Sequence, residues 1–444
     1  MPSVSIVIPA YNCAAYLRSC LEHLKRSTVQ PMECIVVDDG STDDSADIAR
    51  KYGAHVISGG PRSGPAHARN VGAKAAKGDI LFFIDSDVCV YPNTVAKMAA
   101  HFDGNAGLDA VIGSYDDSPK VRDFLSQYRN LMHCYVHQNG HEEACTFWSG
   151  CGAIRRSVFL DHSGFDDKTY RRPAIEDIEL GYRLKRAGRK MVLDPTMQVK
   201  HLKAWSFFEL VKTDILNRGV PWTELILRDR FLPNDLNIQL SQRVSVALVF
   251  LLVTFTTISA VFLGVPLLLP LLALFFLILS RYEAGSPLSL RYKSTIGTLI
   301  LVASIVFMAY RSERFELVPP VLLAYVLVFL RHRYSYTSKI RHRITGIFAG
   351  VSMLFTILLV VTYFPRHPLV LCVFLLLGAL ILLNSQFYLF LAARQGRLFA
   401  LAAIPFHLLF HFYNGISFLV GLSRHYLRTW VSTERKPIPI SPKR

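Results

Sequence analysis

Acidic residues are almost missing from the second half of this 444-residue chain. Residues 241–444 hold 20 lysines and arginines but only four acids, which are Glu283, Glu313, Glu316 and Glu434. The first 240 residues hold 29 bases and 29 acids, so the formal net charge of +16 belongs entirely to the second half. A basic excess can indicate nucleic-acid binding. Here it lies among long apolar runs, so we expect membrane lipids rather than nucleic acid as the partner.

Other features are also scarce. Only 18% of the residues are charged and 51% are hydrophobic, which excludes a disordered polyelectrolyte and exceeds the apolar content of an ordinary soluble domain. None of the eight cysteines forms a Cys-x-x-Cys pair, so free thiols in a reducing compartment are expected. The apolar run Val4–Ile8 is too short for a signal peptide, and we expect none.

Long apolar runs dominate the chain after Arg243. No charged residue follows until Arg281, and this stretch suits two helices, because one bilayer crossing needs about 20 residues. Further candidate spans are about 295–310, 317–330, 344–364 and 369–391. Strongly basic loops alternate with less basic ones, which predicts about six crossings and a cytoplasmic first half. A last apolar stretch, 398–422, would put the basic tail outside if it spanned, so we expect it to be interfacial or re-entrant.

The first half alternates strand-like and helical patterns. The predicted strands are 4–8, 33–37 and 80–84, and the predicted helices are 13–26 and 43–52, the latter with Ser41–Thr42 as its N-cap. This alternation predicts a parallel α/β sheet, whose ligands gather at the carboxyl ends of the strands. Polar clusters follow the three predicted strands at Pro9–Asn12, Asp38–Ser41 and Asp85–Asp87.

Two acidic groups can carry chemistry. Asp85 and Asp87 end a strand, where a pair of carboxylates can share one Mg²⁺ or Mn²⁺ ion with diphosphate oxygens. A polar loop explains most isolated Asp-x-Asp pairs equally well. Glu176 and Asp177 open a helical pattern, where acids commonly serve the helix dipole but can also deprotonate an acceptor hydroxyl. His201 follows a strand-like run, Lys190–Leu193, and a turn at Asp194–Pro195, and a lone histidine is more often structural than a ligand.

Five motifs in order give these residues a common context. They are Val7–Asn12, Val36–Asp43, Gly64–Gly72, Asp85–Asp87 and Glu176–Asp177. In this combination, about residues 3–205 resemble the family 2 glycosyltransferases of GT-A fold. The resemblance implies a nucleotide-sugar donor carrying UDP or GDP, a divalent cation (Mg²⁺ or Mn²⁺), and inversion at the anomeric carbon.

The resemblance also implies a donor site. Pro9, Tyr11 and Asp39 would line the base pocket, with Asp39 accepting from an N–H of uracil or guanine. Arg69 would approach the base or the diphosphate. Gly150 lies in a loop of small residues that would let the backbone approach the donor sugar.

A metal site and a catalytic pair are implied in the same way. Asp85 would contact the ribose and the metal, Asp87 would be the main metal ligand, and His201 would complete the metal site. Glu176 and Asp177 would be the catalytic acids, with Asp177 as the general base on the acceptor hydroxyl.

One departure from the family concerns processivity. Processive members such as cellulose and hyaluronan synthases carry Gln-x-x-Arg-Trp after the base, and the nearest string here, Arg218–Trp222, has a different spacing. We therefore expect one sugar per lipid-linked or cell-envelope glycan acceptor. Two alternatives remain: a multi-pass transporter or flippase with a degenerate glycosyltransferase-like domain, and a short-chain polysaccharide synthase.

The expected architecture is an α/β, Rossmann-like nucleotide-sugar-binding domain of GT-A fold followed by an all-α transmembrane domain. The cytoplasmic catalytic domain would span 1–203, and the membrane region of about six helices 243–423. Residues 204–242 would form amphipathic helices at the membrane interface, although packing on the catalytic domain explains them nearly as well. Residues 424–444 would be a basic cytoplasmic tail.

Overall fold

The computed structural model describes residues 2–263 and 368–434. They fall into two compact units, each described by itself. The first consists of Met1–Arg122, Ser126–Leu240 and Ile416–Arg444, and the second of Asp123–Leu125 and Ser241–Gly415. The candidate spans near 295–310, 317–330 and 344–364 lie outside the described residues, as does the chain after residue 434.

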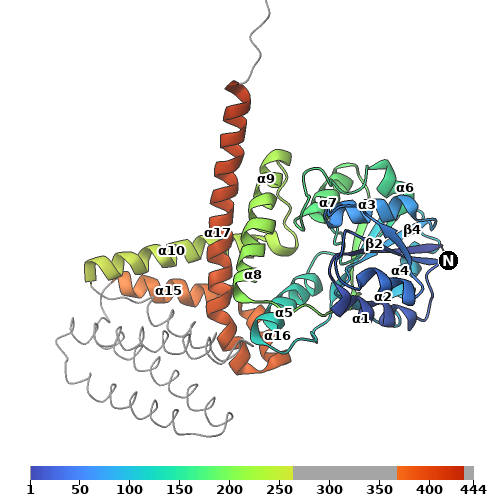
Figure 1. The fold of residues 1–444 in the computed structure, drawn as a ribbon. Coiled ribbons are helices and arrows are strands. Elements are labelled where there is room, and N and C mark those ends of the chain that lie inside the picture. The colour runs from blue at the N-terminus through green and yellow to red at the C-terminus, as the bar shows by residue number, and fades with distance from the viewer. Residues whose placement is uncertain (1, 264–367, 435–444) are drawn as a thin grey trace, which may run out of the picture. The chain divides into compact units, whose positions relative to one another are not determined.

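The first unit is built on one eight-stranded sheet (Figure 1). Its strands are β1 (Val4–Ala10), β2 (Glu33–Asp38), β3 (His55–Ser58), β4 (Ile80–Ile84), β5 (Val88–Val90), β6 (Ala110–Tyr115), β7 (Cys151–Arg155) and β8 (Met191–His201). Their order is β3-β2-β1-β4-β7-β6-β8-β5, with β3, β2, β1 and β4 parallel and β7 antiparallel to both neighbours. This mixed, Rossmann-like α/β sheet confirms the expected fold class. The expectation of a parallel sheet holds for β1 to β4 but is wrong for β7 and β5, which pair antiparallel with their neighbours. The sheet brings the ends of β1, β2 and β4 to one edge.

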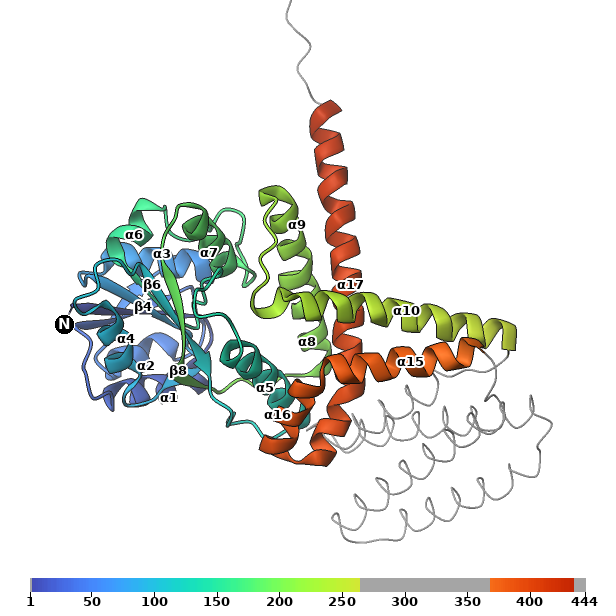
Figure 2. The same ribbon diagram turned by 180° about the vertical axis from the view of Figure 1, so that it is seen from behind.

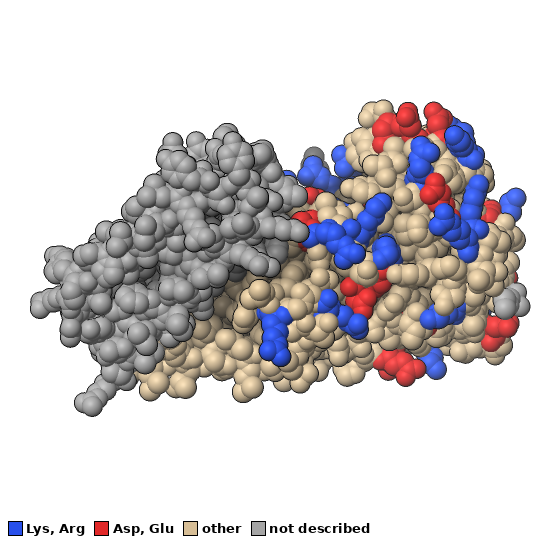
Figure 3. Space-filling view, turned by 90° about the horizontal axis from the view of Figure 1, so that it is seen from below, with Lys and Arg blue, Asp and Glu red and all other residues tan. Residues whose placement is uncertain are grey.

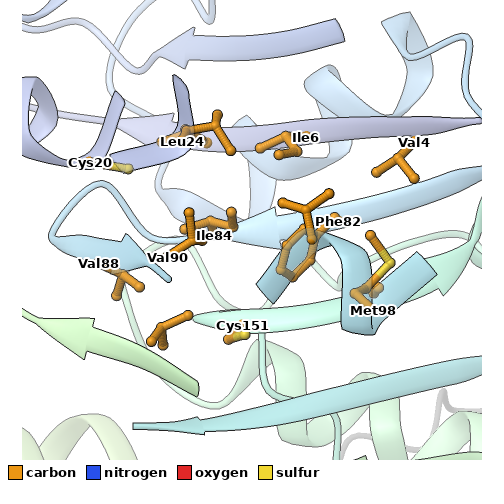
Figure 4. Close-up of a cluster of buried hydrophobic side chains, with 14 of the residues drawn as sticks. Val4, Ile6, Cys20, Leu24, Phe82, Ile84, Val88, Val90, Met98 and Cys151 are labelled. Atoms are coloured by element: carbon orange, nitrogen blue, oxygen red, sulfur yellow. The ribbon is translucent and has the colours of Figure 1, made fainter. Parts of the chain in front are cut away.

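Helices cover both faces of the sheet. Their bounds are α1 (Ala14–Lys25), α2 (Ser45–Lys51), α3 (Pro65–Ala75), α4 (Thr94–Phe102), α5 (Phe124–Gln138), α6 (Arg156–Asp161) and α7 (Glu176–Arg186). Helices α1, α2 and α4 pack on one face, where side chains from β1, β4, β5 and β7 converge on them (Figure 4). Helices α3, α6 and α7 pack on the other face, and their buried residues form a second apolar core. Both faces are thus apolar, which is typical of strands covered by helices.

The predicted strands and the two predicted helices are confirmed to within a few residues, but two local expectations are wrong. The N-cap of α2 is Asp44. Ser41 and Thr42 instead bond to Asn12: the Asn12 amide donates to Ser41 Oγ at 3.0 Å, and the Thr42 amide donates to Asn12 Oδ1 at 2.7 Å. These residues therefore join the loops after β1 and β2.

The second wrong expectation is the turn at Asp194–Pro195. Strand β8 continues through it to His201, because its pairing with β6 shifts register between Ile112 and Ser114. Such an irregularity accommodates a proline, which cannot donate to the ladder. His201 therefore ends a strand and pairs with Val88 of β5.

Residues 204–240 are helical, as their spacing predicts. They form α8 (Phe207–Lys212), a π-helical segment η1 (Thr213–Gly219), α9 (Val220–Asp229) and a short η2 (Leu236–Ile238). The end of helix α17 (Arg397–Glu434) belongs to this unit too. It packs closely on η1 and α9, since a Cβ added at Gly219 would lie 2.5 Å from Ser417 and one at Gly421 would lie 2.6 Å from Thr223.

The second unit is helical, with α10 (Leu240–Leu263), α15 (Pro368–Leu383), α16 (Ser385–Gln395) and the first part of α17. Within this unit α10 and α15 run side by side, and α17 runs across them (Figures 1 and 2). Among the described residues two helices, Leu240–Phe262 and Arg397–Thr429, are long and apolar enough to cross a membrane. Helices α15 and α16 make a third candidate, bent by 62°. The span expected at 369–391 is therefore broken, because Asn384 separates the two helices.

The charge distribution fits the sequence count. On the face drawn in Figure 3, basic and acidic side chains are interspersed over one part of the described surface, and the rest carries few charged side chains. This agrees with the balance of 29 bases and 29 acids in the first 240 residues.

Candidate active site

The edge formed by the ends of β1, β2 and β4 carries the predicted donor-binding residues. Pro9 is buried inside β1 and pairs with Val37, whereas Tyr11 lies just beyond the strand and is 38% exposed. The guanidinium of Arg62 stacks on the Tyr11 ring, 3.9 Å from its centroid. The Tyr11 ring is therefore partly exposed at this edge, with Arg62 lying over one of its faces.

Asp39 is tied to the loop before α3. Its two carboxylate oxygens accept from the amides of Ser63 (2.7 Å) and Gly64 (2.8 Å), and the residue is only 3% exposed. Gly64 has a φ of +98°, and a Cβ there would lie 2.3 Å from the carbonyl oxygen of Arg171. Glycine is required at this close approach. The base-binding role of Asp39 remains a prediction, and in this structure its carboxylate fixes the loop.

Arg69 joins two of the predicted acids. From α3, its Nη2 donates to Asp85 at 2.5 Å and its Nη1 donates to Glu176 at 3.0 Å. Arg69 is 4% exposed and Glu176 is also 4% exposed, while the second oxygen of Glu176 accepts from the Ala174 amide at 3.0 Å. The guanidinium therefore connects the end of β4 to the start of α7.

Burial and charge oppose each other in this group. Burial acts against the charge of Arg69, but the Asp85 and Glu176 carboxylates outweigh it, and the pKa of Arg69 is raised. Burial raises the pKa of Asp85 and of Glu176, with the Arg69 charge opposing the rise in both. The three side chains depend on one another, because a buried charge without its partner is costly.

Asp87 and His201 are brought together by the pairing of β5 with β8. Asp87 lies 3.7 Å from Nε2 of His201, and the Leu202 amide donates to the Asp87 carbonyl at 2.9 Å. Although burial acts to raise it, the pKa of Asp87 lies below its ordinary value, since the His201 imidazole stabilises the carboxylate. An ionised carboxylate beside an imidazole, with Asp85 two residues away, is a donor set that suits a divalent cation such as Mn²⁺.

The described residues contain no group of three or more His, Cys, Asp or Glu side chains already arranged around a metal. The Asp85 side chain is engaged by Arg69 instead. Asp87 and His201, 3.7 Å apart, remain the candidate ligands, whereas Asp85 would have to share its oxygens between a cation and Arg69.

Aromatic rings hold His201 in place. Tyr115, at the end of β6, stacks on the His201 ring with centroids 4.6 Å apart and an interplanar angle of 23°. The Tyr115 ring also meets Trp148 edge-on at 4.8 Å. This stacking fixes the plane of the imidazole without using its nitrogen atoms.

Asp177 is placed by close packing of α7. A Cβ at Gly181 would lie 2.3 Å from the amide nitrogen of Phe147, so the helix approaches this loop only because position 181 is glycine. One turn earlier, Asp177 Oδ2 accepts from both the amide and the hydroxyl of Ser149, each at 3.1 Å. The carboxylate is half-buried, and its two hydrogen bonds from Ser149 fix its orientation.

Gly150 lies beside this acid. A Cβ there would lie 2.9 Å from the Trp148 indole, so the residue must be small. Because β7 pairs antiparallel with β4, Cys151 is opposite Ile84, which brings the Gly150 loop next to Asp85. The structure thus places the residues predicted to bind the metal, to approach the donor sugar and to act as the general base around one strand end.

Sequence similarity assigns this domain to a family. Residues 5–162 match the sequence model of glycosyl transferase family 2. This segment is therefore a family 2 glycosyltransferase domain, which confirms the resemblance carried by the first four motifs. The fifth motif, Glu176–Asp177, lies after the matched residues.

Individual relatives match parts of the chain. Glycosyltransferase GlyG of Streptococcus pneumoniae is 36% identical over 117 residues, 25% of this chain and 38% of its own length. Validoxylamine A glucosyltransferase of Streptomyces hygroscopicus is 30% identical over 227 residues, 44% of this chain and 54% of its own length. The chain thus spans between about a third and a half of the length of these two curated relatives.

Among solved structures, the mannosyltransferase PcManGT from Pyrobaculum calidifontis, solved with GDP-Man and Mn²⁺, is 17% identical. It covers 80% of this chain and 87% of its own, with a TM-score of 0.37. TarS of Staphylococcus aureus, solved with UDP-GlcNAc, is 18% identical over 51% of this chain and 65% of its own, with a TM-score of 0.38.

The sequence did not identify several side chains that support the site. The Arg69 bridge to Glu176, the Ser149 hydrogen bonds to Asp177 and the Tyr115 ring on His201 join residues far apart in the chain. A local signal existed only for Ser149, which lies in the predicted small-residue loop. The others follow from strand order, which the motifs do not encode.

Proposed function

We propose that this chain is a membrane-bound, inverting, metal-dependent glycosyltransferase of the hexosyltransferase type. It would move a sugar from a UDP- or GDP-sugar to a lipid-linked or cell-envelope glycan acceptor. The observation that carries the proposal is the convergence of Asp85, Asp87 and Asp177 at one edge of the sheet, with Asp177 held by two hydrogen bonds from Ser149. The donors named with PcManGT and TarS, GDP-Man and UDP-GlcNAc, support a nucleotide-sugar donor.

Transfer would be a single displacement. The acceptor hydroxyl attacks the anomeric carbon as its proton passes to the Asp177 carboxylate. A new carbon–oxygen bond forms, the bond from the sugar to the diphosphate breaks, and its electrons leave on the nucleoside diphosphate. Attack from the opposite face inverts the anomeric centre and needs no covalent nucleophile.

Asp87 and His201 would hold the cation, with Asp85 contributing beside Arg69. Bound there, Mg²⁺ or Mn²⁺ would supply Lewis-acid stabilisation of the diphosphate charge. The Tyr115 stack would keep His201 oriented, because outer partners orient metal-binding imidazoles.

The helical region would anchor the domain at a bilayer. The most apolar 18 residues within Leu240–Phe262 of α10 have a mean hydropathy of 2.4, which suits a crossing. Phe208 (77% exposed) and Leu216 (53% exposed) give α8 and η1 apolar surface suited to the membrane interface. The catalytic domain would then face the cytoplasm at the membrane, which is the inner membrane in a bacterial cell.

The end of α17 supports a cytoplasmic tail. Arg424 and Arg428 lie 3.2 Å and 3.1 Å from Glu224 of α9, in the same compact unit as the catalytic domain. A tail that leaves this contact begins on the side of the catalytic domain.

Transfer of a single sugar remains part of the proposal. Trp222, in the string nearest to the processive motif, donates its indole N–H to the Tyr182 hydroxyl at 2.9 Å and packs against α7. This supports a structural use of Trp222.

The test is turnover by the full-length protein in lipid nanodiscs. A panel of UDP- and GDP-sugars is incubated with Mg²⁺ or Mn²⁺, and release of the nucleoside diphosphate is followed. We expect one donor to be hydrolysed slowly, and Asp87→Asn to abolish its turnover. Nucleotide binding without turnover of any donor would favour the transporter alternative.

A further inference from the structure

A second charged cluster lies outside the proposed donor and metal residues. Arg129 of α5 donates to Asp214 Oδ1 of η1 at 2.7 Å, and Arg218 Nη1 lies 3.5 Å from the same oxygen. Asp214 is 4% exposed and Arg129 is 9% exposed. Among the described residues, no other carboxylate forms an ion pair with either arginine. Two guanidinium groups therefore share one carboxylate, and one positive charge is left over.

Helix α5 connects this cluster to the aromatic side of the site. Arg129, His133 and His137 follow one another at intervals of one turn. The His133 ring lies 5.1 Å from Trp148, which neighbours the loop that holds Asp177. Nδ1 of His133 is buried and has no hydrogen-bond partner among the residues that the structure describes, and a buried polar atom of this kind calls for one. Burial lowers the pKa of His133 well below its ordinary value, helped by the charges of His137 and both arginines, so its ring is neutral.

The cluster borders two parts of the site. The Tyr115 ring, which stacks on His201, lies 4.8 Å from the His133 ring, and the charge of Asp177 acts on Arg218. Burial and the Arg129 charge lower the pKa of Arg218, whereas the negative charges of Asp214 and Asp177 oppose this. Arg69, in contrast, forms ion pairs with Asp85 and Glu176. The side chain of Arg218 is 37% exposed, so it can meet a ligand that approaches Asp177.

We propose that Arg129 and Arg218, with Nδ1 of His133, bind a phosphate group carried by the acceptor. Two guanidinium groups offer paired donors that match phosphate oxygens, which is the geometry for which arginine is used. The leftover positive charge is one that a phosphate would neutralise. This inference rests on the proposed function, and it narrows the acceptor to a lipid phosphate or diphosphate whose head group reaches the base.

Asp214 gives the proposal a sharp test. If the ion pairs serve only stability, loss of either partner harms the protein. If the arginines bind phosphate, Asp214 competes with that phosphate for both of them. Asp214→Asn should then preserve or tighten phosphate binding.

The experiment measures binding of farnesyl phosphate, as a soluble polyprenyl phosphate probe, to the full-length protein in phosphatidylcholine nanodiscs. Farnesol is the matched ligand without phosphate, and UDP and GDP report on the donor side. Arg218→Gln and the charge-balanced double variant Arg129→Gln/Asp214→Asn should each weaken farnesyl phosphate binding about ten-fold or more, as expected for a lost charge-assisted hydrogen bond. Nucleotide affinity should change by less than about two-fold.

Arg228→Gln is the matched control, because Arg228 is also paired with acids, Glu179 and Asp229, but does not touch this cluster. It should leave farnesyl phosphate binding unchanged. Equal binding of farnesyl phosphate by wild type and Arg218→Gln would overturn the proposal. So would a loss confined to UDP or GDP, which would assign the arginines to the donor. Failure of the wild type to turn over any donor would instead refute the proposed function, since phosphate binding is measured independently of it.

Discussion

The two units bury their polar groups in different ways. In the first unit, buried carboxylates such as Glu176 and Asp214 are paired with arginines. In the described part of the second unit, no carboxylate is buried, and the buried polar groups are hydroxyl, amide and imidazole groups. The Asn384 side-chain amide, for example, donates to the Ser245 hydroxyl at 3.0 Å. The Tyr388 hydroxyl is hydrogen-bonded to Nδ1 of His407 at 3.1 Å. Buried charge is thus confined to the first unit among the described residues, and each of these two buried carboxylates has a guanidinium partner.

The largest expected effect tests whether a carboxylate of the first unit takes part in catalysis. Asp177→Asn removes the proposed base but retains the size and most hydrogen bonds of the side chain. We expect sugar transfer to fall by about 10²- to 10⁴-fold, the range for general base catalysis, with donor affinity unchanged. Transfer rates and nucleotide binding in nanodiscs check this. Ser149→Ala should reduce transfer much less, and full activity of Asp177→Asn would refute the base assignment.

The next effect is on stability. Arg69→Gln leaves Asp85 and Glu176 without their buried partner, so we expect a loss of about 3–5 kcal/mol in the free energy of unfolding. Thermal unfolding of the full chain in detergent reports it. The control is Arg50→Gln, which breaks an exposed pair with Asp47 and should change stability by at most about 0.5 kcal/mol. If the two variants unfold alike, the Arg69 bridge is not a stabilising element.

These two residues also show what the sequence can predict. Asp177 was predictable, because its place at the start of a helix follows from local spacing and a family motif. The partners of Arg69 were not, since they depend on α3 and α7 meeting across the end of β4. The same holds for Arg129 and Asp214, which lie 85 residues apart and meet through helix packing.

The long course of β8 was missed for a related reason. Proline after aspartate normally indicates a turn, and only the register shift against β6 allows the strand to continue. The break at Asn384 was missed because composition reports apolar length, not helix direction. Sequence periodicity therefore predicts which segments form helices and strands. Where these segments end, and which of them pack together, depends on tertiary contacts.

A smaller effect is expected in the second unit. Asn384→Leu removes the hydrogen bond to Ser245, and a neutral hydrogen bond of this kind contributes about 1 kcal/mol. We expect a loss of about that size in thermal stability and unchanged nucleotide binding. The double variant Asn384→Leu/Ser245→Ala should be no less stable than the single variant. If Asn384→Leu lost as much stability as Arg69→Gln, neutral hydrogen-bonded pairs would stabilise the protein as much as buried ion pairs do. That result would contradict the contrast drawn between the two units.

The smallest effect concerns charge at the surface of the first unit. Glu224→Gln removes the partner of Arg424 and Arg428, whose side chains are 47% and 66% exposed. Exposed pairs are worth about 0–1 kcal/mol and are screened by salt, so the variant should differ from wild type only at low ionic strength. Thermal unfolding at two salt concentrations measures this.

The packing of Gly421 against Thr223 does not involve charge, so a protease site placed after Glu434 should stay accessible from the same side of the membrane in both proteins. A change of side in Glu224→Gln would mean that these surface charges, and not helix packing, fix the end of α17.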